Sequence, residues 1–230
     1  MPKRPGRRIV FSNGSTAPFF SRQIAFNLGS PMAFSDFLFP QVQHDLGLAF
    51  DEANLFGAAQ PVAVRSEFQT QLELGAAVAL SINTEKARSE FIIAPVLLEL
   101  KRMEGERLGL FSGVPLDGDS ARGLNGVCDF VLTTSGLQLV MAAPLVAIVE
   151  AKNDNLMSGL GQCIAAMVAA ELMNEREDRL GRTVFGVVTT GSAWKFLRLT
   201  GTAVTADRKE YYVDNIGKVL GILHQMVQGV

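Results

Sequence analysis

Apolar residues recur along the chain with two different periods, which together predict a mixed α/β protein. The helical period marks four segments: 66–79, 84–103, 158–176 and 216–226. In the second of them Glu85 suits the first turn, and Pro95 in the interior should bend the helix. Short runs rich in β-branched and aromatic residues mark six candidate strands: 108–114, 127–133, 145–151, 183–189, 194–199 and 210–213. The stretch 117–123, rich in Gly and Asp, is expected to be a loop after the first of them. The middle of the chain therefore has the order helix, three strands, helix, strand, and the three consecutive strands are expected to form a meander.

The chain divides by composition into three parts. Residues 1–31 are rich in Arg, Ser, Gly and Pro, contain no acidic residue and show no clean period. We expect them to be a disordered N-terminal extension, or the result of a mis-assigned start with Met32 as the true beginning. Residues 32–82 are expected to form an N-terminal helical subregion, and residues 83–230 the core with a C-terminal helix. The length of the chain fits one domain.

Two of the candidate strands carry isolated charged residues. Glu150 and Lys152 flank Ala151 at the end of an otherwise apolar run, and Asp129 stands within another. Residues two apart in a strand point to the same face, so Glu150 and Lys152 are expected to lie together, roughly 6–7 Å apart along the strand. Buried charges are costly unless they are paired or hold a metal. One interpretation is a divalent-metal site, and the other is a pair of charges at strand ends with Lys152 bound to Glu150.

The ordered set Asp129 and Glu150-Ala-Lys152 resembles the PD-(D/E)xK nuclease superfamily, over about residues 84–199. Three phrases are also similar to uncharacterised, mostly cyanobacterial, stand-alone members of that superfamily: Glu85-Lys-Ala-Arg-Ser-Glu90, Gly123-Leu-Asn-Gly126 and Gly159-Leu-Gly-Gln162. The resemblance implies a restriction endonuclease-like αβββαβ core, in which helices flank a central mixed sheet of four to five strands. Cys128 stands where the family pattern has proline, which removes no ligand. As neighbours of Asp129 in a strand, Cys128 and Phe130 are expected to face the other way.

The resemblance also implies the chemistry of a metal-dependent nuclease. Asp129, Glu150 and the carbonyl of Ala151 would hold Mg²⁺ or Mn²⁺, hard ions that prefer oxygen ligands. Lys152 would stabilise the negative charge that develops when water attacks the phosphate. The expected partner is nucleic acid, with DNA favoured over RNA. A homodimer that cuts both strands, and a catalytically silent module that binds nucleic acid or protein on the same fold, remain as alternatives.

Two further polar residues are candidates for the same site. Glu90 shares the apolar face of its helix with Ile93, Ala94 and Leu97, so it is either an auxiliary acid near the metal or a surface residue paired with Lys86. Gln162 opens a long helix with an alanine-rich face. The resemblance places this glutamine beside the active site, and the alternative is a residue of the first helical turn that binds water.

Composition excludes several other classes of function. With two histidines, His44 and His224, neither placed among other ligands, the sequence offers no Ser-His-Asp triad and no zinc site. Without residues 1–31 the chain has 16 basic and 23 acidic residues, a net charge of −7, which disfavours non-specific binding of nucleic acid. The uncharged stretch at 137–149 is too short to span a membrane, and two cysteines form no CxxC motif. We therefore expect a cytoplasmic protein with no membrane partner.

Overall fold

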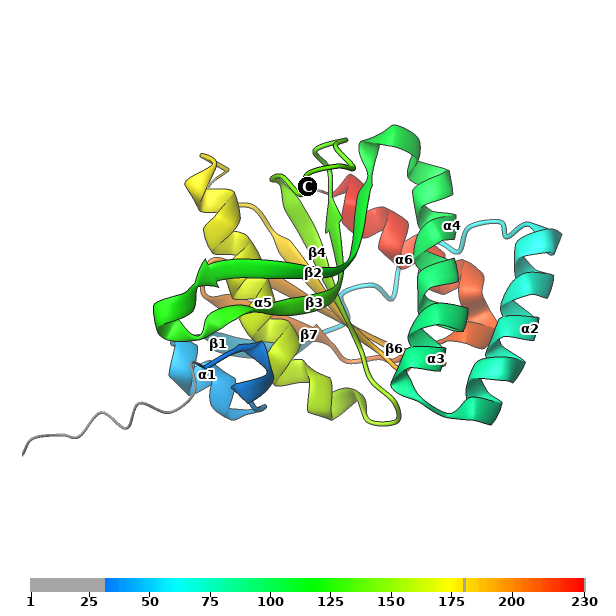
Figure 1. Cartoon of the computed structure of the whole chain (residues 1–230), viewed down its shortest axis with the longest axis horizontal. Helices are drawn as coiled ribbons and strands as arrows, with labels where there is room; N and C mark the ends of the chain where they lie inside the picture. The colour runs from blue at the N-terminus through cyan, green and yellow to red at the C-terminus, as the bar shows by residue number, and fades with distance from the viewer. Residues whose placement is uncertain (1–31, 180, 230) are drawn as a thin grey trace, which may run out of the picture.

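A mixed, open β-sheet runs through the described part of the chain, and helices flank it on both faces (Figure 1). The structure is a computed structural model that describes residues 32–179 and 181–229. The expectation for residues 1–31 lies outside the described residues. The α-helices are α1 (Gln41–Leu46), α2 (Ser66–Ile82), α3 (Glu85–Arg88), α4 (Ala94–Glu104), α5 (Leu156–Arg176) and α6 (Ile216–Gln228). The strands are β1 (Ala49–Ala53), β2 (Gly109–Asp119), β3 (Leu124–Thr133), β4 (Leu145–Ala151), β5 (Val184–Thr189), β6 (Ala193–Thr200), β7 (Ala203–Asp207) and β8 (Tyr211–Tyr212).

The strand order across the sheet is β1-β7-β6-β5-β4-β3-β2, and β8 pairs with β6. Strands β2, β3 and β4 form an antiparallel meander, and β5 returns parallel to β4 after the crossover through α5. The predicted α/β class and the mixed sheet flanked by helices are thus confirmed. The eight strands of the described sheet exceed the four to five that we expected.

Two strands escaped the sequence analysis for physical reasons. The β1 strand contains Asp51 and Glu52 and lies at an edge of the sheet, where polar side chains are tolerated, so it lacks an apolar pattern. It lies within residues 32–82, which also hold α1 and α2 and were expected to be helical. The β7 strand has the sequence Ala-Val-Thr-Ala-Asp, which is short and rich in small residues.

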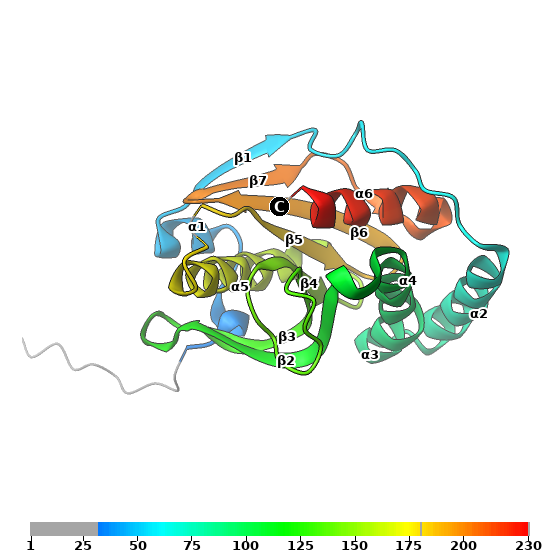
Figure 2. The same ribbon diagram turned by 90° about the horizontal axis from the view of Figure 1, so that it is seen from above.

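Two separate cores fill the space on either side of the sheet. One joins α2, α4 and α6 to one face, and the other joins α1 and α5 to the opposite face (Figure 2). Helix α5 is long and apolar enough to cross a membrane by length and composition, but most of it is buried against the sheet. Its hydrophobicity is therefore that of a core helix.

The segment predicted as one bent helix, 84–103, is continuous but not uniform. A π-helical turn, η2 (Ser89–Ile93), lies between α3 and α4. Pro95 follows this turn and has no N–H to donate to the carbonyl of Phe91, four residues earlier. Helix α2 packs closely against this turn at Gly75, where an added Cβ would lie 2.3 Å from the backbone oxygen of Phe91. The irregularity that we attributed to Pro95 thus takes the form of a π-bulge, which is common at functional sites.

Candidate active site

The β3 and β4 strands separate at the point where the two candidate acids lie. Their pairing ends at Phe130 and Val149, and the next residues outward are Asp129 and Glu150. Beyond this point β3 continues to pair with β2, while Ala151 pairs with Thr189 of β5. We call this point of separation between β3 and β4 the fork. In the fork, Asp129 Oδ2 accepts a 2.8 Å hydrogen bond from the backbone N–H of Ala151. The fork thus brings the acid of one strand to the Glu-x-Lys segment of the next.

The regular alternation of side chains breaks at Asp129. We expected Cys128 and Phe130 to face the same side, opposite to Asp129, as the pleat of a regular strand requires. Instead Cys128 packs into the core with α5, and Phe130 packs into the core on the other face. That expectation was wrong, because the pairing of β3 with β4 ends here and the regular pleat is not kept between Cys128 and Phe130.

Glu150 is buried and has a cation as its partner. Its side chain is 3% exposed, and Lys152 Nζ lies 2.7 Å from Glu150 Oε1. Lys152 Nζ also lies 3.3 Å from Gln162 Oε1 of α5. The stem of Lys152 packs against Gly159, where a Cβ would lie 3.0 Å from its Cγ and Cε atoms. Three of the predicted residues, Glu150, Lys152 and Gln162, therefore form one hydrogen-bonded chain.

The charges of these residues are strongly coupled. Burial, followed by the negative charge of Asp129, raises the pKa of Glu150 to about 7, although the hydrogen bond from Lys152 opposes this. Burial also acts to lower the pKa of Lys152, but the hydrogen bond to Glu150 and the surrounding carboxylates outweigh it, so that the pKa is raised. Lys152 is thus held as an ammonium ion, while Glu150 gains or loses its proton near neutral pH.

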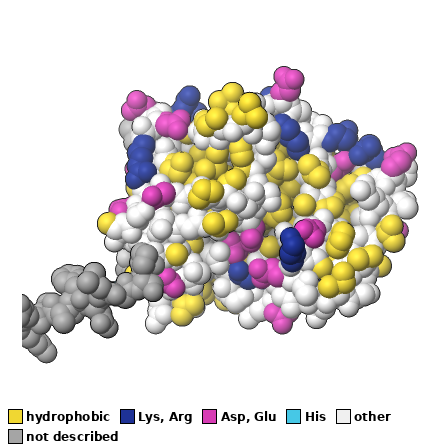
Figure 3. Space-filling model, viewed as in Figure 1, with side chains coloured by type: hydrophobic (Ala, Val, Ile, Leu, Met, Phe, Trp, Pro, Cys, Tyr) yellow, Lys and Arg dark blue, Asp and Glu magenta, His cyan; other side chains and the backbone are white. Residues whose placement is uncertain are grey.

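A pocket of about 320 Å³ opens beside the fork, between the β2–β3 hairpin and the helix that begins at Glu85. On the face shown in Figure 3, acidic side chains gather around a basic one in this region. Asp129 and Ala151 line the pocket from the sheet, whereas Glu150 lies outside its lining. The pocket is lined by Glu85, Lys86, Ser89, Glu90, Ala94, Ser112, Asp129, Phe130 and Ala151.

Glu90 satisfies parts of both interpretations of the sequence. It lines the pocket, but its side chain is half exposed. Glu90 Oε1 lies 2.6 Å from Nζ of Lys86, four residues earlier in the same helix, and the two form an ion pair. The sequence analysis missed Glu85, which we regarded as a helix-end residue. Glu85 lines the same pocket, and its charge contributes to the raised pKa of Glu150. No local pattern in the sequence separates Glu85 from an ordinary acidic residue of a first helical turn.

One more polar residue near the site escaped notice. Asn153 follows Lys152, and its side-chain oxygen is buried without a hydrogen-bond partner in the described structure. Nothing in the sequence pattern distinguishes this asparagine from the polar residues of an ordinary loop. It adds an unpaired acceptor beside the Glu-x-Lys segment.

The oxygen donors at the fork suit Mg²⁺ or Mn²⁺. Asp129 and Glu150 each keep one carboxylate oxygen that makes no hydrogen bond within the described residues. The carbonyl of Ala151 adds a third hard donor. No group of three or more His, Cys, Asp or Glu side chains stands ready for a metal in residues 32–179 and 181–229. A cation here would therefore rest on two carboxylates, one backbone carbonyl and water, as Mg²⁺ commonly does.

The raised pKa of Glu150 predicts how the stability of the metal-free protein depends on pH. Between pH 4.5, the ordinary pKa of the group, and about 7, the folded protein keeps a proton that the unfolded chain releases. The free energy of unfolding should therefore fall as pH rises through this window, by up to about 3 kcal/mol from this group. Urea denaturation in a chelator, at several pH values, should show this fall in the wild type and a smaller one in Glu150→Gln. Equal pH dependence in both proteins would contradict it.

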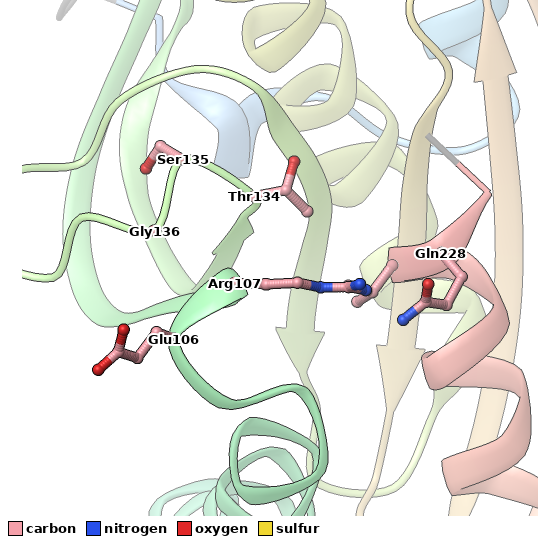
Figure 4. Close-up of a pocket in the computed structure, with 7 residues that line it drawn as sticks. Glu106, Arg107, Thr134, Ser135, Gly136 and Gln228 are labelled. Atoms are coloured by element: carbon pink, nitrogen blue, oxygen red, sulfur yellow. The ribbon is translucent and has the colours of Figure 1, made fainter.

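Other charged clusters in the described structure have structural roles. A larger pocket of about 530 Å³ lies near the C-terminal end of α6, where Arg107 and Gln228 point toward each other and Glu106 points away (Figure 4). Both Arg107 and Gln228 donate to the buried Glu104, which also bonds His224. These contacts fix α4 against α6. None of these residues lines the pocket at the fork.

Both cysteines are buried and free. Burial, together with the charges of Glu150 and Asp129, raises the pKa of the Cys128 thiol to about 12. Burial likewise raises the pKa of Cys163, again helped by Glu150. Neither thiol is therefore suited to act as a nucleophile.

No protein-family model matches this chain, and no curated protein matches it either.

Proposed function

We propose that this protein is a metal-dependent nuclease of the PD-(D/E)xK type, which hydrolyses phosphodiester bonds, with DNA as the favoured substrate. The observation that carries the proposal is the fork in the sheet, where Asp129 of one strand meets the Glu150-Ala-Lys152 segment of the next beside an open pocket. Two chain segments separated by about twenty residues thus supply the acids and the cation that such a reaction requires.

The order of elements around the fork supports the same proposal. A helix made of α3, η2 and α4 precedes the meander β2-β3-β4, and α5 then leads to β5, parallel to β4. This is the αβββαβ order that the resemblance implies for a restriction endonuclease-like core. The remaining strands, β6, β7, β8 and β1, extend the sheet on the side away from the fork.

Each residue of the site has a chemical role in this proposal. Asp129, Glu150 and the Ala151 carbonyl would hold Mg²⁺ or Mn²⁺. When bound, this cation would neutralise the phosphate and lower the pKa of a water molecule. The ammonium of Lys152 stabilises negative charge on the phosphate oxygens, and Gln162 holds Lys152 in place. Glu90, with Glu85, orients water at the wall of the pocket.

The protein would act in the cytoplasm, since both thiols are free and α5 is a buried core helix. The same fold without catalysis would give a module that binds nucleic acid or protein. A homodimer that places two such forks on opposite strands is a further arrangement. A cleavage assay separates the nuclease from the silent binding module.

Asp129→Asn is expected to lower metal-dependent cleavage by about 10²-fold or more, because it removes a ligand charge while it keeps the shape of the side chain. The assay would offer plasmid, single-stranded DNA, branched DNA and RNA in Mg²⁺ and in Mn²⁺. Asp117→Asn is the matched control, since Asp117 lies on the same hairpin, is exposed and does not line the pocket. It should cleave as the wild type does.

Absence of cleavage on every substrate, together with no metal binding by calorimetry, would refute the nuclease and favour the binding module. Metal binding that requires Asp129 and Glu150, without cleavage of any substrate, would confirm the assignment of the metal ligands and contradict the assignment of nuclease activity. Equal cleavage by Asp129→Asn and the wild type would remove Asp129 from the site.

A further inference from the structure

One glycine lies directly across the sheet from Asp129. In the β2–β3 pairing Ser112 faces Phe130 and Val114 faces Cys128, so Gly113 falls opposite Asp129. Gly113 has a φ of 63°, a left-handed conformation, and a Cβ placed on it would meet no atom within 4 Å. The register places position 113 across from Asp129 on the neighbouring strand, and a side chain there would stand in open space.

The pocket extends to β2 at Ser112, the residue before Gly113. Helical residues Glu85, Lys86 and Glu90 line the pocket opposite the sheet. On the sheet side β2 is the outermost strand, and Ser112 and Gly113 are both exposed. Glycine inside a strand often marks a place where a ligand or another backbone comes close.

We infer that the scissile strand of the substrate enters the site by crossing β2 at Gly113, and that it does so as a single strand. The inference rests on the proposed function and adds a substrate class to it. The missing side chain leaves the path to Asp129 clear, and the exposed Ser112 hydroxyl, which lines the pocket, can donate to a phosphate oxygen.

Charge favours a single strand over a duplex. The two lysines at the site are already paired, Lys86 with Glu90 and Lys152 with Glu150. A protein that makes about 6–10 phosphate contacts with duplex DNA neutralises those phosphates with its own Lys and Arg side chains. A single strand that places one or two phosphates in the pocket makes a smaller demand on these cations.

Gly113→Asn is the test, because asparagine tolerates a positive φ better than most residues do and its side chain fills the open space. Gly47→Asn is the matched control. Gly47 also has a left-handed backbone, with φ 66° and ψ 37°, has open space around its Cβ position, and ends α1, outside the pocket. Binding of a fluorescent single-stranded oligonucleotide, and of the same sequence as a duplex, would be measured by anisotropy in Ca²⁺.

Gly113→Asn is expected to weaken binding of the single strand by about tenfold or more, whereas Gly47→Asn stays within about twofold of the wild type. The rise in Tm on addition of Mn²⁺ should be the same in all three proteins, which shows that the metal site is intact. Equal binding by the two variants, or tighter binding of the duplex than of the single strand by the wild type, would overturn the inference and leave the nuclease standing. A wild type that neither binds nor cleaves any nucleic acid would overturn both.

Discussion

Glu150→Gln is expected to lower metal-dependent cleavage by about 10³-fold and, at the same time, to raise the stability of the metal-free protein above neutral pH. The two effects have one cause. The charge of Glu150 is held in a buried position beside Asp129, which raises its pKa to about 7, so ionisation costs folding energy. Glutamine keeps an oxygen that can accept the hydrogen bond from Lys152, but it carries no charge to hold a cation. Cleavage rates and urea denaturation at about pH 8 would measure both effects.

Glu99→Gln provides the opposite case as a matched control. Glu99 is also buried, but hydrogen bonds from Arg65, and then from Arg102, lower its pKa to about 2. Its charge therefore stabilises the fold above its ordinary pKa of 4.5, and the neutral variant should be less stable at pH 8 with cleavage unchanged. If Glu150→Gln loses both stability and cleavage, its inactivity reflects misfolding, and the assignment of Glu150 as a ligand fails.

Gly118→Val is expected to destabilise the protein by about 3 kcal/mol or more. Gly118 lies in the outer half of β2, where a Cβ would stand 2.4 Å from the Cα of Ala169 and 2.7 Å from its Cβ. The backbones of β2 and α5 are thus in contact, so a larger side chain at this position must push the β2–β3 hairpin away from α5. Arg176 of α5 also donates to the carbonyls of Asp117 and Gly118. Urea denaturation of the metal-free protein would measure the loss.

Asp117→Val is the neighbouring control, because Asp117 is exposed and its side chain bonds only Ser120 among the described residues. We expect a change within about 0.5 kcal/mol. A Gly118→Val protein as stable as this control would show that α5 can shift away from the hairpin, and that the contact does not fix the position of β2 at the site.

The main elements follow from periodicity because burial imposes it. The four predicted helices and the six predicted strands all occur, since each has an apolar face or run that packs into one of the two cores. The outer half of β2 was expected to be a loop, because 117–123 are rich in Gly and Asp. Gly118 lets β2 pack closely against α5. Local composition cannot distinguish a glycine that permits such packing from a glycine in a turn.

The part of the candidate site that depends on the alternation of side chains within one strand was predictable. Alternation correctly placed Lys152 beside Glu150, and the structure adds Gln162 to the same chain of hydrogen bonds. The fork at Asp129, the break in alternation around it and the position of Glu85 depend on how separate segments diverge and pack. Such features arise from tertiary contacts, which no local pattern records.

The buried thiols have a practical consequence for labelling experiments. Cys128 and Cys163 are 1% and 0% exposed, and burial, helped by the nearby carboxylates, raises the pKa of each thiol and keeps it neutral. Maleimide and similar reagents attack the thiolate, so the folded protein should react slowly at both positions. A single cysteine introduced on the exposed part of the β2–β3 hairpin would then accept a fluorophore selectively, with both native cysteines left in place. Spectroscopy could follow this hairpin in an otherwise unaltered chain.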